Sequence, residues 1–503
     1  MDALERDLSQ VLCLLRSLKN STAPVNRIPP EVFSLIPDYC DDDSAYQDLI
    51  ALTHVCRHWR DILISRSSLW AQLEFMDVDE TRTYIERSRN SPLEIFLERE
   101  HGCAYLDDAF SLVIPHIHRV KTLGISTDFL PDALRHFRCH TPLLENLHIE
   151  IQVPRAPVLD STLFNGDLSS LRTLNLRNVT TLLPWNNLAN LTSFSLASCT
   201  PRRNLITRLL NFFDSAPLLE DIALVDSTPK SSSMQPGRMV PLPHLRKLTV
   251  DASQAPSVIL NHLIIPTGAS LILKFSFSGG ESPLIDYLPE TSPNLKNLTH
   301  ITTINLSFGS IRCARLQGPS GGVHLSANWE DRRGVPSYTM DCLIFHSLGT
   351  PTFSTTQRLA VSEYRHSRPA KSTECPVFRA LSSAPNLRAL TLTKCNGSPF
   401  IHALNPQTDP HELVLCPKLE ELILYTKIPH FGDFRTEDII DMTRSRDLKG
   451  AKLLSIIIVG LNEFELGEEA LKLREHVTHV EYRLNGKAPA WDYSPGESSH
   501  GSE

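Results

Sequence analysis

The chain has 503 residues, of which 41% are hydrophobic and 21% charged, and it is long enough for several globular domains or one long solenoid. Its formal net charge of −8 argues against a nucleic-acid-binding surface spread over the whole molecule. The 11 cysteines include no Cys-x-x-Cys pair, so neither a zinc site nor a disulfide framework is indicated, and a reducing cytoplasmic or nuclear compartment is expected.

Residues 1–25 are predicted to form an N-terminal amphipathic helix. Apolar residues recur there at intervals of three and four and share one stripe: Leu4, Leu8, Val11, Leu15 and Leu18. The helix either packs on the next domain or forms a short oligomerising coil, for which about two and a half heptads is short. The segment is acidic where a secretory signal is basic, and no apolar run is long enough to span a bilayer, so no membrane partner is expected.

Residues 26–76 are predicted to form a small domain of three short helices. Pro29 and Pro30 suit the first turn of a helix that stops at Pro37. A second helix is predicted from apolar residues spaced by three or four: Leu49, Leu52, Val55, Cys56, Trp59, Ile62 and Leu63. Leu69 and Trp70 close the unit. About 45 residues bury too little surface to be very stable alone, so such a unit gains from a partner.

This segment resembles the F-box domain over that domain's full length. Ile28-Pro29-Pro30-Glu31-Val32 stands where the family has Leu-Pro-x-Glu-Val or -Ile, and Val55-Cys56-Arg57-His58-Trp59-Arg60 matches its Val-Cys-Arg-x-Trp core. Leu69-Trp70 matches the closing pair. Ile28 replaces the usual leucine, and Pro37 falls where the first helix commonly continues.

The resemblance implies a protein partner. That partner is a Skp1-like adaptor and, through it, a cullin of a cullin–RING (SCF) ubiquitin ligase. The positions expected to hold the domain together or to face the adaptor are Ile28, Pro29, Val32, Leu52, Val55, Cys56, Trp59 and Trp70. The two tryptophans suit either role, since large aromatic residues are anchors in cores and in interfaces alike, and a core role is favoured for both.

Residues 77–485 are predicted to form a degenerate leucine-rich-repeat solenoid, which makes the fold class α/β. The template L-x-x-L-x-L begins at Val120, Leu144, Leu171, Leu191, Leu219, Leu245, Ile301, Leu387 and Leu419. The first spacings are 24, 27, 20, 28 and 26, and the next, 56, is twice 28; leucine-rich repeats have periods of about 20 to 29. Cys199 and Cys395 occupy the buried polar position of two copies, whereas Ser227 and Lys427 fill it elsewhere.

The remaining segments complete the predicted organisation. Residues 203–215 read as a repeat helix, and residues 81–88 followed by a strand from Leu93 read as a degenerate first unit, an arrangement that resembles fungal F-box proteins. The repeat register fails around 309–376, where a long insertion with one or two distorted repeats is expected. Residues 486–503, rich in Pro, Gly and Ser, are predicted to be disordered.

Signals for catalysis and for metal binding are weak. Gly318 to Gly322 fits G-x-S-x-G with Ser320 as nucleophile, but no alternating strand-and-helix pattern of a hydrolase surrounds it, and a flexible loop is favoured. His54 and His58 are spaced like helical metal ligands without a third ligand, and the run His136 to His140 is isolated. We therefore expect no cofactor, no metal and no enzymatic activity.

Two functions remain open. The first is a non-catalytic substrate receptor that docks on the adaptor and presents an unknown protein target, bound on the repeat face, to the ligase. The alternative is a leucine-rich-repeat scaffold or binding protein outside a ubiquitin ligase, with a Ser320 hydrolase as a remote variant. No nucleic-acid partner is expected in either case.

Overall fold

The computed structural model describes residues 2–484 with gaps, of which the longer are 40–44, 99–107, 128–137, 152–157, 182–187, 200–204, 227–237, 278–293, 330–353, 365–375, 407–412, 426–434 and 461–466. The described residues form two compact units, residues 1–202 and 203–503. The predicted disordered tail, 486–503, lies outside the described residues, as do Ser227 and Lys427. Among the described residues, no helix combines the length and apolar character needed to cross a bilayer.

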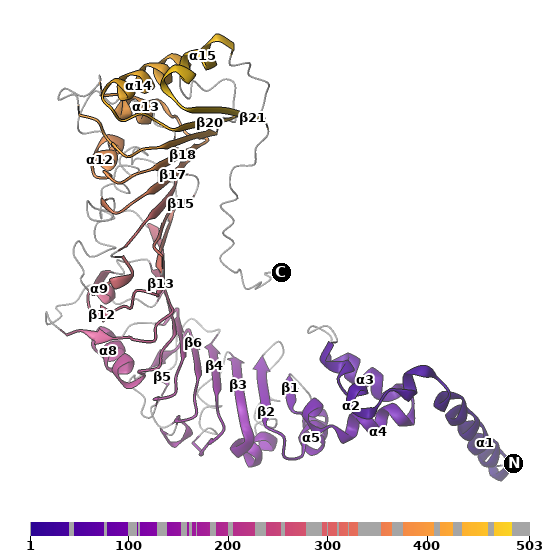
Figure 1. The fold of residues 1–503 in the computed structure, drawn as a ribbon. Helices are drawn as coiled ribbons and strands as arrows, with labels where there is room; N and C mark the ends of the chain where they lie inside the picture. Colours follow the sequence, from indigo (N-terminus) through magenta and orange to yellow (C-terminus); the bar gives the residue numbers. More distant parts are fainter. Residues whose placement is uncertain are drawn as a thin grey trace. The chain divides into compact units, whose positions relative to one another are not determined.

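The first unit begins with short helices (Figure 1). After α1 (Asp2–Ser21) come the 3-10 helix η1 (Pro24–Arg27), α2 (Pro30–Phe33) and the 3-10 helix η2 (Ile36–Tyr39). Next are α3 (Ala45–Val55), α4 (Arg57–Ser65) and the 3-10 helix η3 (Ser67–Trp70). Prolines at the start of η1 and α2 fix φ near the helical value, which favours helix initiation there.

The predicted single helix from Leu49 to Leu63 is wrong, because Cys56 divides it. Cys56 is extended, with φ −159° and ψ 170°, so α3 ends at Val55 and α4 begins at Arg57. The guanidinium of Arg60 donates to the carbonyl of Thr53 at 3.0 Å and so satisfies an acceptor at the end of α3. The change of direction carries Ile62 and Leu63 into the core.

The interpretation that α1 packs its apolar stripe on the next domain is also wrong. Leu4, Leu8, Val11, Leu15 and Leu18 are all exposed. The stripe forms as predicted, but it faces away from the rest of the unit.

A parallel sheet follows the helices of the first unit. Its strands are β1 (Gln72–Glu74), β2 (Leu93–Glu98), β3 (Val120–Thr127), β4 (Asn146–Ile151), β6 (Thr173–Arg177) and β8 (Ser193–Ala197), each pairing with the next. Leu123, Leu147, Leu174 and Phe194 face one another in register and are almost completely buried. The alternation of buried and polar positions therefore gives the sheet one core face.

Shorter elements complete this unit. They are α5 (Val78–Ser88), the 3-10 helices η4 (Ile114–Arg119) and η6 (Leu163–Gly166), and the strand pair β5 (Val158–Leu159) and β7 (Thr180–Thr181). The predicted first repeat, a helix over 81–88 and a strand from Leu93, corresponds to α5 and β2.

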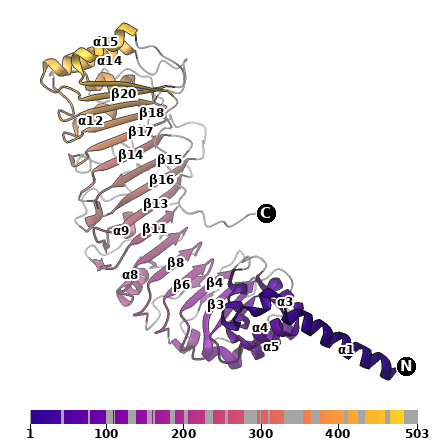
Figure 2. The same cartoon turned by 45° about the vertical axis from the view of Figure 1, so that its right-hand side comes forward.

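The second unit has a longer sheet that is parallel except at one place. Its strands are β9 (Asp221–Val225), β11 (Lys247–Ala252), β13 (Ser270–Phe277), β14 (Thr303–Phe308), β15 (Ile311–Gln317), β16 (Gly322–Trp329), β17 (Arg358–Ser362), β18 (Ala389–Thr393), β19 (Glu421–Tyr425), β20 (Ser455–Gly460) and β21 (His479–Leu484). In space the order is β13, β16, β15, β14, β17, as Figure 2 shows.

The exception is the hairpin of β15 and β16. β15 runs antiparallel to both of its neighbours, β14 and β16, while β16 is parallel to β13 and β14 is parallel to β17. The chain thus leaves a gap of two strands between β13 and β14 and fills it with the following hairpin. This lies in the region where the repeat register fails, and the described part of that region also contains β17.

Helices and short strands cover the core side of this sheet (Figure 1). They are α8 (Leu205–Ser215), α9 (Ser257–Leu260), α12 (Pro376–Ser382), α13 (Ser398–Leu404), α14 (Thr436–Leu448), α15 (Gly467–His476), the 3-10 helix η8 (Lys296–Leu298), and the pair β10 (Val240–Pro241) and β12 (Leu263–Ile264). An α/β fold, with a helical module before a long and mostly parallel sheet, is confirmed; it is typical of a leucine-rich-repeat solenoid.

The repeat template is confirmed as a strand signal. Each predicted copy coincides with a strand: β3, β4, β6, β8, β9, β11, β14, β18 and β19. The double interval between β11 and β14 contains β13. Cys199 and Cys395 are buried, and the Cys395 thiol donates to the carbonyls of Val361 and Thr393, both at 3.2 Å. The buried polar position therefore satisfies backbone acceptors of its own repeat and of the preceding one.

A buried arginine fixes loops in each unit. Arg119 donates to the Ser88 hydroxyl at 3.0 Å and to the Ser91 carbonyl at 2.9 Å, at the end of α5. Arg446 of α14 is completely buried and donates to the carbonyls of Leu415 and Cys416, both at 2.8 Å. Burial lowers the pKa of both arginines from its ordinary value. Because the planar guanidinium reaches several acceptors at once, one side chain holds a whole turn.

Candidate functional site

Trp70 joins the helical module to the first repeat. Its side chain is 0% exposed, and its indole N–H donates to the carbonyl of Leu63 at 2.9 Å. The ring meets Tyr84 of α5 edge-on at a centroid distance of 4.9 Å, and the guanidinium carbon of Arg87 lies 4.3 Å from its centroid. β1 begins two residues later and pairs with β2. The module is therefore continuous with the sheet of its own unit.

Trp59 holds the first part of the module against α4. Its ring lies 4.7 Å from that of Phe33, and its indole N–H donates to the side-chain oxygen of Asn26 at 2.5 Å. The guanidinium of Arg66 donates to the carbonyl of Ser34. Segments 24–27 and 30–34 are thus fixed by side chains from α4 and from the residue after it.

The residues singled out in the module divide into two sets by exposure. Val32 and Val55 are 54% and 56% exposed, and Pro29 is also exposed. Ile28, Leu52, Cys56 and Trp59 are half-buried, and Trp70 is fully buried. The first set lies at the surface, whereas Trp59 and Trp70 of the second set make contacts within the unit.

Two further apolar residues of the module are exposed. Leu35 follows α2 and is 44% exposed, and Tyr39 at the end of η2 is 87% exposed. The sequence placed Leu35 on a helix face but gave no reason to expect it at the surface. Leu35 and Tyr39 thus join Val32 and Val55 among the exposed apolar side chains of the module.

The suspected metal ligands are not assembled. The break at Cys56 puts His54 on α3 and His58 on α4, so they do not share a helix face. Of the run from His136 to His140, the first two residues lie outside the described part, and burial raises the pKa of the Cys139 thiol. Within the described ranges no group of three His, Cys, Asp or Glu residues could hold a metal ion.

The G-x-S-x-G segment is a hairpin turn. Ser320 itself lies outside the described residues, but Gly318 and Gly321 bracket the turn between β15 and β16, with the Gly318 N–H donating to the Gly321 carbonyl at 2.8 Å. A Cβ at Gly321 would overlap the carbonyl of Thr267, so this glycine is required by close packing. A nucleophile elbow needs a strand followed by a helix, and here a strand follows.

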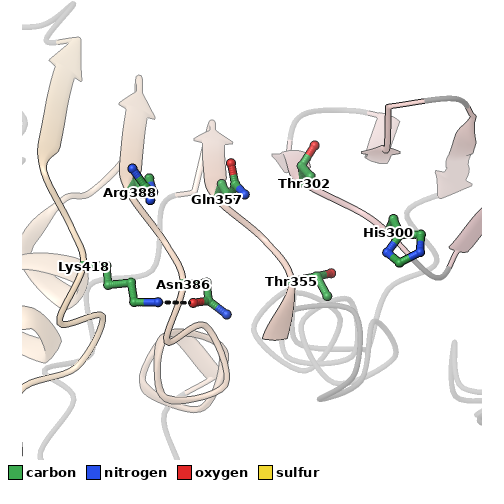
Figure 3. A pocket seen from close by; sticks show the side chains of 7 residues that line it. All are labelled: His300, Thr302, Thr355, Gln357, Asn386, Arg388 and Lys418. Carbon is green, nitrogen blue, oxygen red and sulfur yellow. Dashed lines mark hydrogen bonds between the residues drawn. The ribbon is translucent and has the colours of Figure 1, made fainter.

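A polar groove crosses the strand starts of the second unit. It encloses about 440 Å³ and is lined by His300, Thr302, Thr355, Gln357, Asn386, Arg388 and Lys418 (Figure 3). The lining residues stand one or three residues before the first residue of a strand. They line up across the sheet because β14, β17, β18 and β19 are in register. The spacing of parallel strands therefore sets the spacing of the polar groups.

Hydrogen bonds orient the groove residues. The ammonium of Lys418 donates to the Asn386 side-chain oxygen at 2.7 Å, as Figure 3 shows, and the Asn386 amide donates to the Ser354 carbonyl at 2.7 Å. Arg388 lies 3.5 Å from the carboxylate of Glu420. Lys418 and Arg388 are exposed, so the groove presents positive charge beside neutral polar groups.

Basic groups also meet on the face of this sheet opposite the core. His324 of β16 pairs directly with Arg315 of β15, and Lys274 lies on the adjacent β13. Burial, and to a smaller extent the charges of Arg315 and Lys274, lower the pKa of His324 to about 4. At neutral pH the histidine is therefore uncharged between two cations.

Comparison with known proteins identifies the helical module. The sequence model of one family, described as F-box-like, matches residues 25–76. A search of curated proteins finds no match. The matched range covers the elements from η1 to β1, so the chain carries an F-box-like domain followed by a long parallel-strand region consistent with leucine-rich repeats.

Proposed function

We propose that this chain is a non-catalytic substrate receptor of a cullin–RING ubiquitin ligase. Its F-box-like domain docks on a Skp1-like adaptor and, through it, on a cullin. The repeat sheets bind a target protein, and the ligase's other subunits carry out the ubiquitin chemistry. The F-box-like match over residues 25–76 carries this proposal.

The surface of the module supports adaptor docking. Val32 and Val55 are accessible, while Phe33 and Trp70 of the same module are almost completely buried. Exposed apolar side chains on a rigid support suit a protein interface, because their burial on binding is favourable and costs little ordering. We assign Pro29, Val32, Leu35 and Val55 to the adaptor contact. We assign Trp59 and Trp70 to the core of the module.

The polar groove supports target binding on the second unit. Similar polar positions line the groove at each successive strand. The groove can therefore bind an extended segment of the target, with alternate side chains pointing into it. Arg388 and Lys418 favour acidic side chains, while Gln357 and Asn386 offer hydrogen bonds to a backbone or to amides. Holding the target near the ligase raises the effective concentration of its lysines.

Co-purification with the adaptor tests the docking assignment. Val32→Asp and Val55→Asp place a charge at exposed positions, so each variant keeps the fold of the module but loses the adaptor. Asp61→Lys is the matched control, since Asp61 is exposed on α4 and its change alters the charge of the same module. The adaptor retained is measured beside the thermal unfolding midpoint of each full-length variant.

Retention of the adaptor by both folded aspartate variants would contradict the contact we assign. Recovery of the adaptor without a cullin would instead favour the scaffold function outside a ligase. A target captured by the wild type and lost by Arg388→Glu, with the adaptor still bound, would identify the groove as the target site.

A further inference from the structure

The helix α1 exposes a broad stripe of apolar side chains to solvent. Every described apolar residue from Leu4 to Leu18 is exposed, from 46% at Leu12 to 79% at Leu4. The stripe includes Leu12 and Leu14 beside the regular positions, so it is widest in the middle of the helix. An apolar face of this extent indicates a missing partner.

The opposite face of α1 is turned toward the chain's own F-box-like domain. A hollow of about 430 Å³ is bounded on one side by α1 and on the other by the α3–α4 junction, and its lining is Cys13, Arg16, Ser17, Asn20, Ser21, Asn26, Cys56, Arg57 and His58. The side-chain amide of Asn26 donates to the carbonyl of Asn20 at 2.6 Å, which fixes the end of the helix. The apolar face therefore points away from the module.

The stripe follows a heptad pattern. Leu8 and Leu15 occupy position a, and Leu4, Val11 and Leu18 occupy position d. The flanking e positions are then Glu5, Leu12 and Lys19, and the g positions are Asp7, Leu14 and Ser21. The flanks thus carry opposite charges at the two ends of the helix and leucines in the centre.

These flanking residues select one orientation for a pair of identical helices. In an antiparallel pair centred near Cys13, Leu8 lies opposite Leu18 of the second copy and Val11 opposite Leu15 of the second copy. In this arrangement each e position faces an e position of the second copy. Glu5 of either copy therefore lies beside Lys19 of the other, which gives two symmetry-related ion pairs. Leu12 lies beside Leu12 of the second copy, and Leu14 beside Leu14 of the second copy.

A parallel pair lacks these matches. There g faces the next e, so Asp7 would lie beside Leu12 of the second copy and Leu14 beside Lys19 of the second copy. Each such contact sets a charge against an apolar side chain. A lipid surface fits less well too, because α1 carries three acidic and three basic residues rather than a cationic face.

We infer that α1 is a self-association surface, on which a second copy of this chain docks through its own α1 in an antiparallel pair. The helix of 20 residues is about 30 Å long, so the two F-box-like domains lie at opposite ends of the pair. Each domain then keeps its own exposed face. The short seam makes the dimer weak, so it dissociates on dilution.

The mass of the full-length protein across a dilution series, measured by light scattering, tests this inference. The wild type has twice the chain mass at high concentration and the chain mass at low concentration. Leu8→Glu abolishes the dimer, because a charge enters the seam while helix propensity is little changed. Ser9→Glu, which places the same charge one residue away on the polar side, leaves the dimer unchanged.

Charge exchange tests the orientation. Glu5→Lys and Lys19→Glu each weaken dimerisation about tenfold, since two attractive pairs become repulsive. A mixture of these two variants, or the double variant, restores the wild-type affinity, because opposite charges face each other again. A parallel pair shows no such recovery.

Three results would overturn the inference: a monomer at every concentration, a dimer that tolerates Leu8→Glu, or absence of recovery on charge exchange. Sedimentation of the monomer with phosphatidylcholine and phosphatidylserine vesicles would assign the stripe to a lipid surface instead. None of these measurements involves the adaptor, so they are independent of the proposed receptor function.

Discussion

The F-box-like domain and the repeat sheets treat their apolar residues differently. In the sheets, Leu359, Leu390 and Leu422 face one another in register and are at most 1% exposed, because each strand is flanked by the next repeat. In the domain, Val32 and Val55 belong to equally regular motifs and are more than half exposed. An apolar motif therefore indicates core where the chain supplies its own neighbour, and interface where it does not.

Trp70→Ala is expected to have the largest effect on stability, since this side chain belongs to the buried set of the domain. We expect the free energy of unfolding of the first unit to fall by about 3–5 kcal/mol, because a large side chain with a satisfied indole N–H is removed from a closed core. Chemical denaturation of the full-length chain, followed by tryptophan fluorescence, measures the change.

Trp70→Phe is the control for this first change. It keeps most of the packing against Tyr84 but loses the hydrogen bond to Leu63, so its effect should be clearly smaller. Equal losses for the two variants would show that the hydrogen bond to Leu63, rather than the packing against Tyr84, accounts for the stabilisation by Trp70.

The same comparison explains how far the sequence could predict the fold. The spacing of leucines located strands of both units, because burial on one face imposes a period that survives divergence. β17, β20 and β21 were missed although Thr356, Leu453 and Val477 begin similar patterns. Threonine at the first position of β17 and tyrosine at the last position of β21 depart from the template, whereas the pattern from Leu453 fits it fully.

Other features carried no local signal. The hairpin of β15 and β16 depends on β13 and β14 leaving a gap in the sheet, which is a property of pairing between distant segments. The break at Cys56 involves neither Pro nor Gly. The groove joins residues from four successive repeats, and its members appear unrelated until the strands are in register.

Arg446→Met should show that a buried polar group in the sheet unit is as important as a leucine. Methionine fills much of the space but leaves the carbonyls of Leu415 and Cys416 without their donor, so the free energy of unfolding of the second unit falls by about 1–3 kcal/mol. Arg446→Lys should not restore it, because an ammonium cannot span both acceptors in the plane of a guanidinium. Full stability of the lysine variant would contradict this explanation. Chemical denaturation curves of the wild type, Arg446→Met and Arg446→Lys measure these differences.

His324 is expected to make a smaller, pH-dependent contribution to the free energy of unfolding of the second unit. Its pKa in the folded protein is about 4, below the ordinary 6.5, so on acidification the unfolded chain binds a proton first. The free energy of unfolding therefore decreases as the pH falls through this interval and levels off below it. His324→Gln should remove part of this dependence. The same pH profile for the wild type and His324→Gln would show that the pKa of His324 is not lowered in the folded protein.

Val55→Ala should have the smallest effect on stability, and this makes it the sharpest test of the contrast between the domain and the sheets. Because the side chain is 56% exposed, its truncation should change the free energy of unfolding by about 0.5 kcal/mol or less. Leu390→Ala, the same kind of truncation in a fully buried strand, should cost about 2–5 kcal/mol. If Val55→Ala destabilised the chain as much as Leu390→Ala, the F-box motif would be core throughout, and the adaptor contact would have to lie elsewhere on the domain.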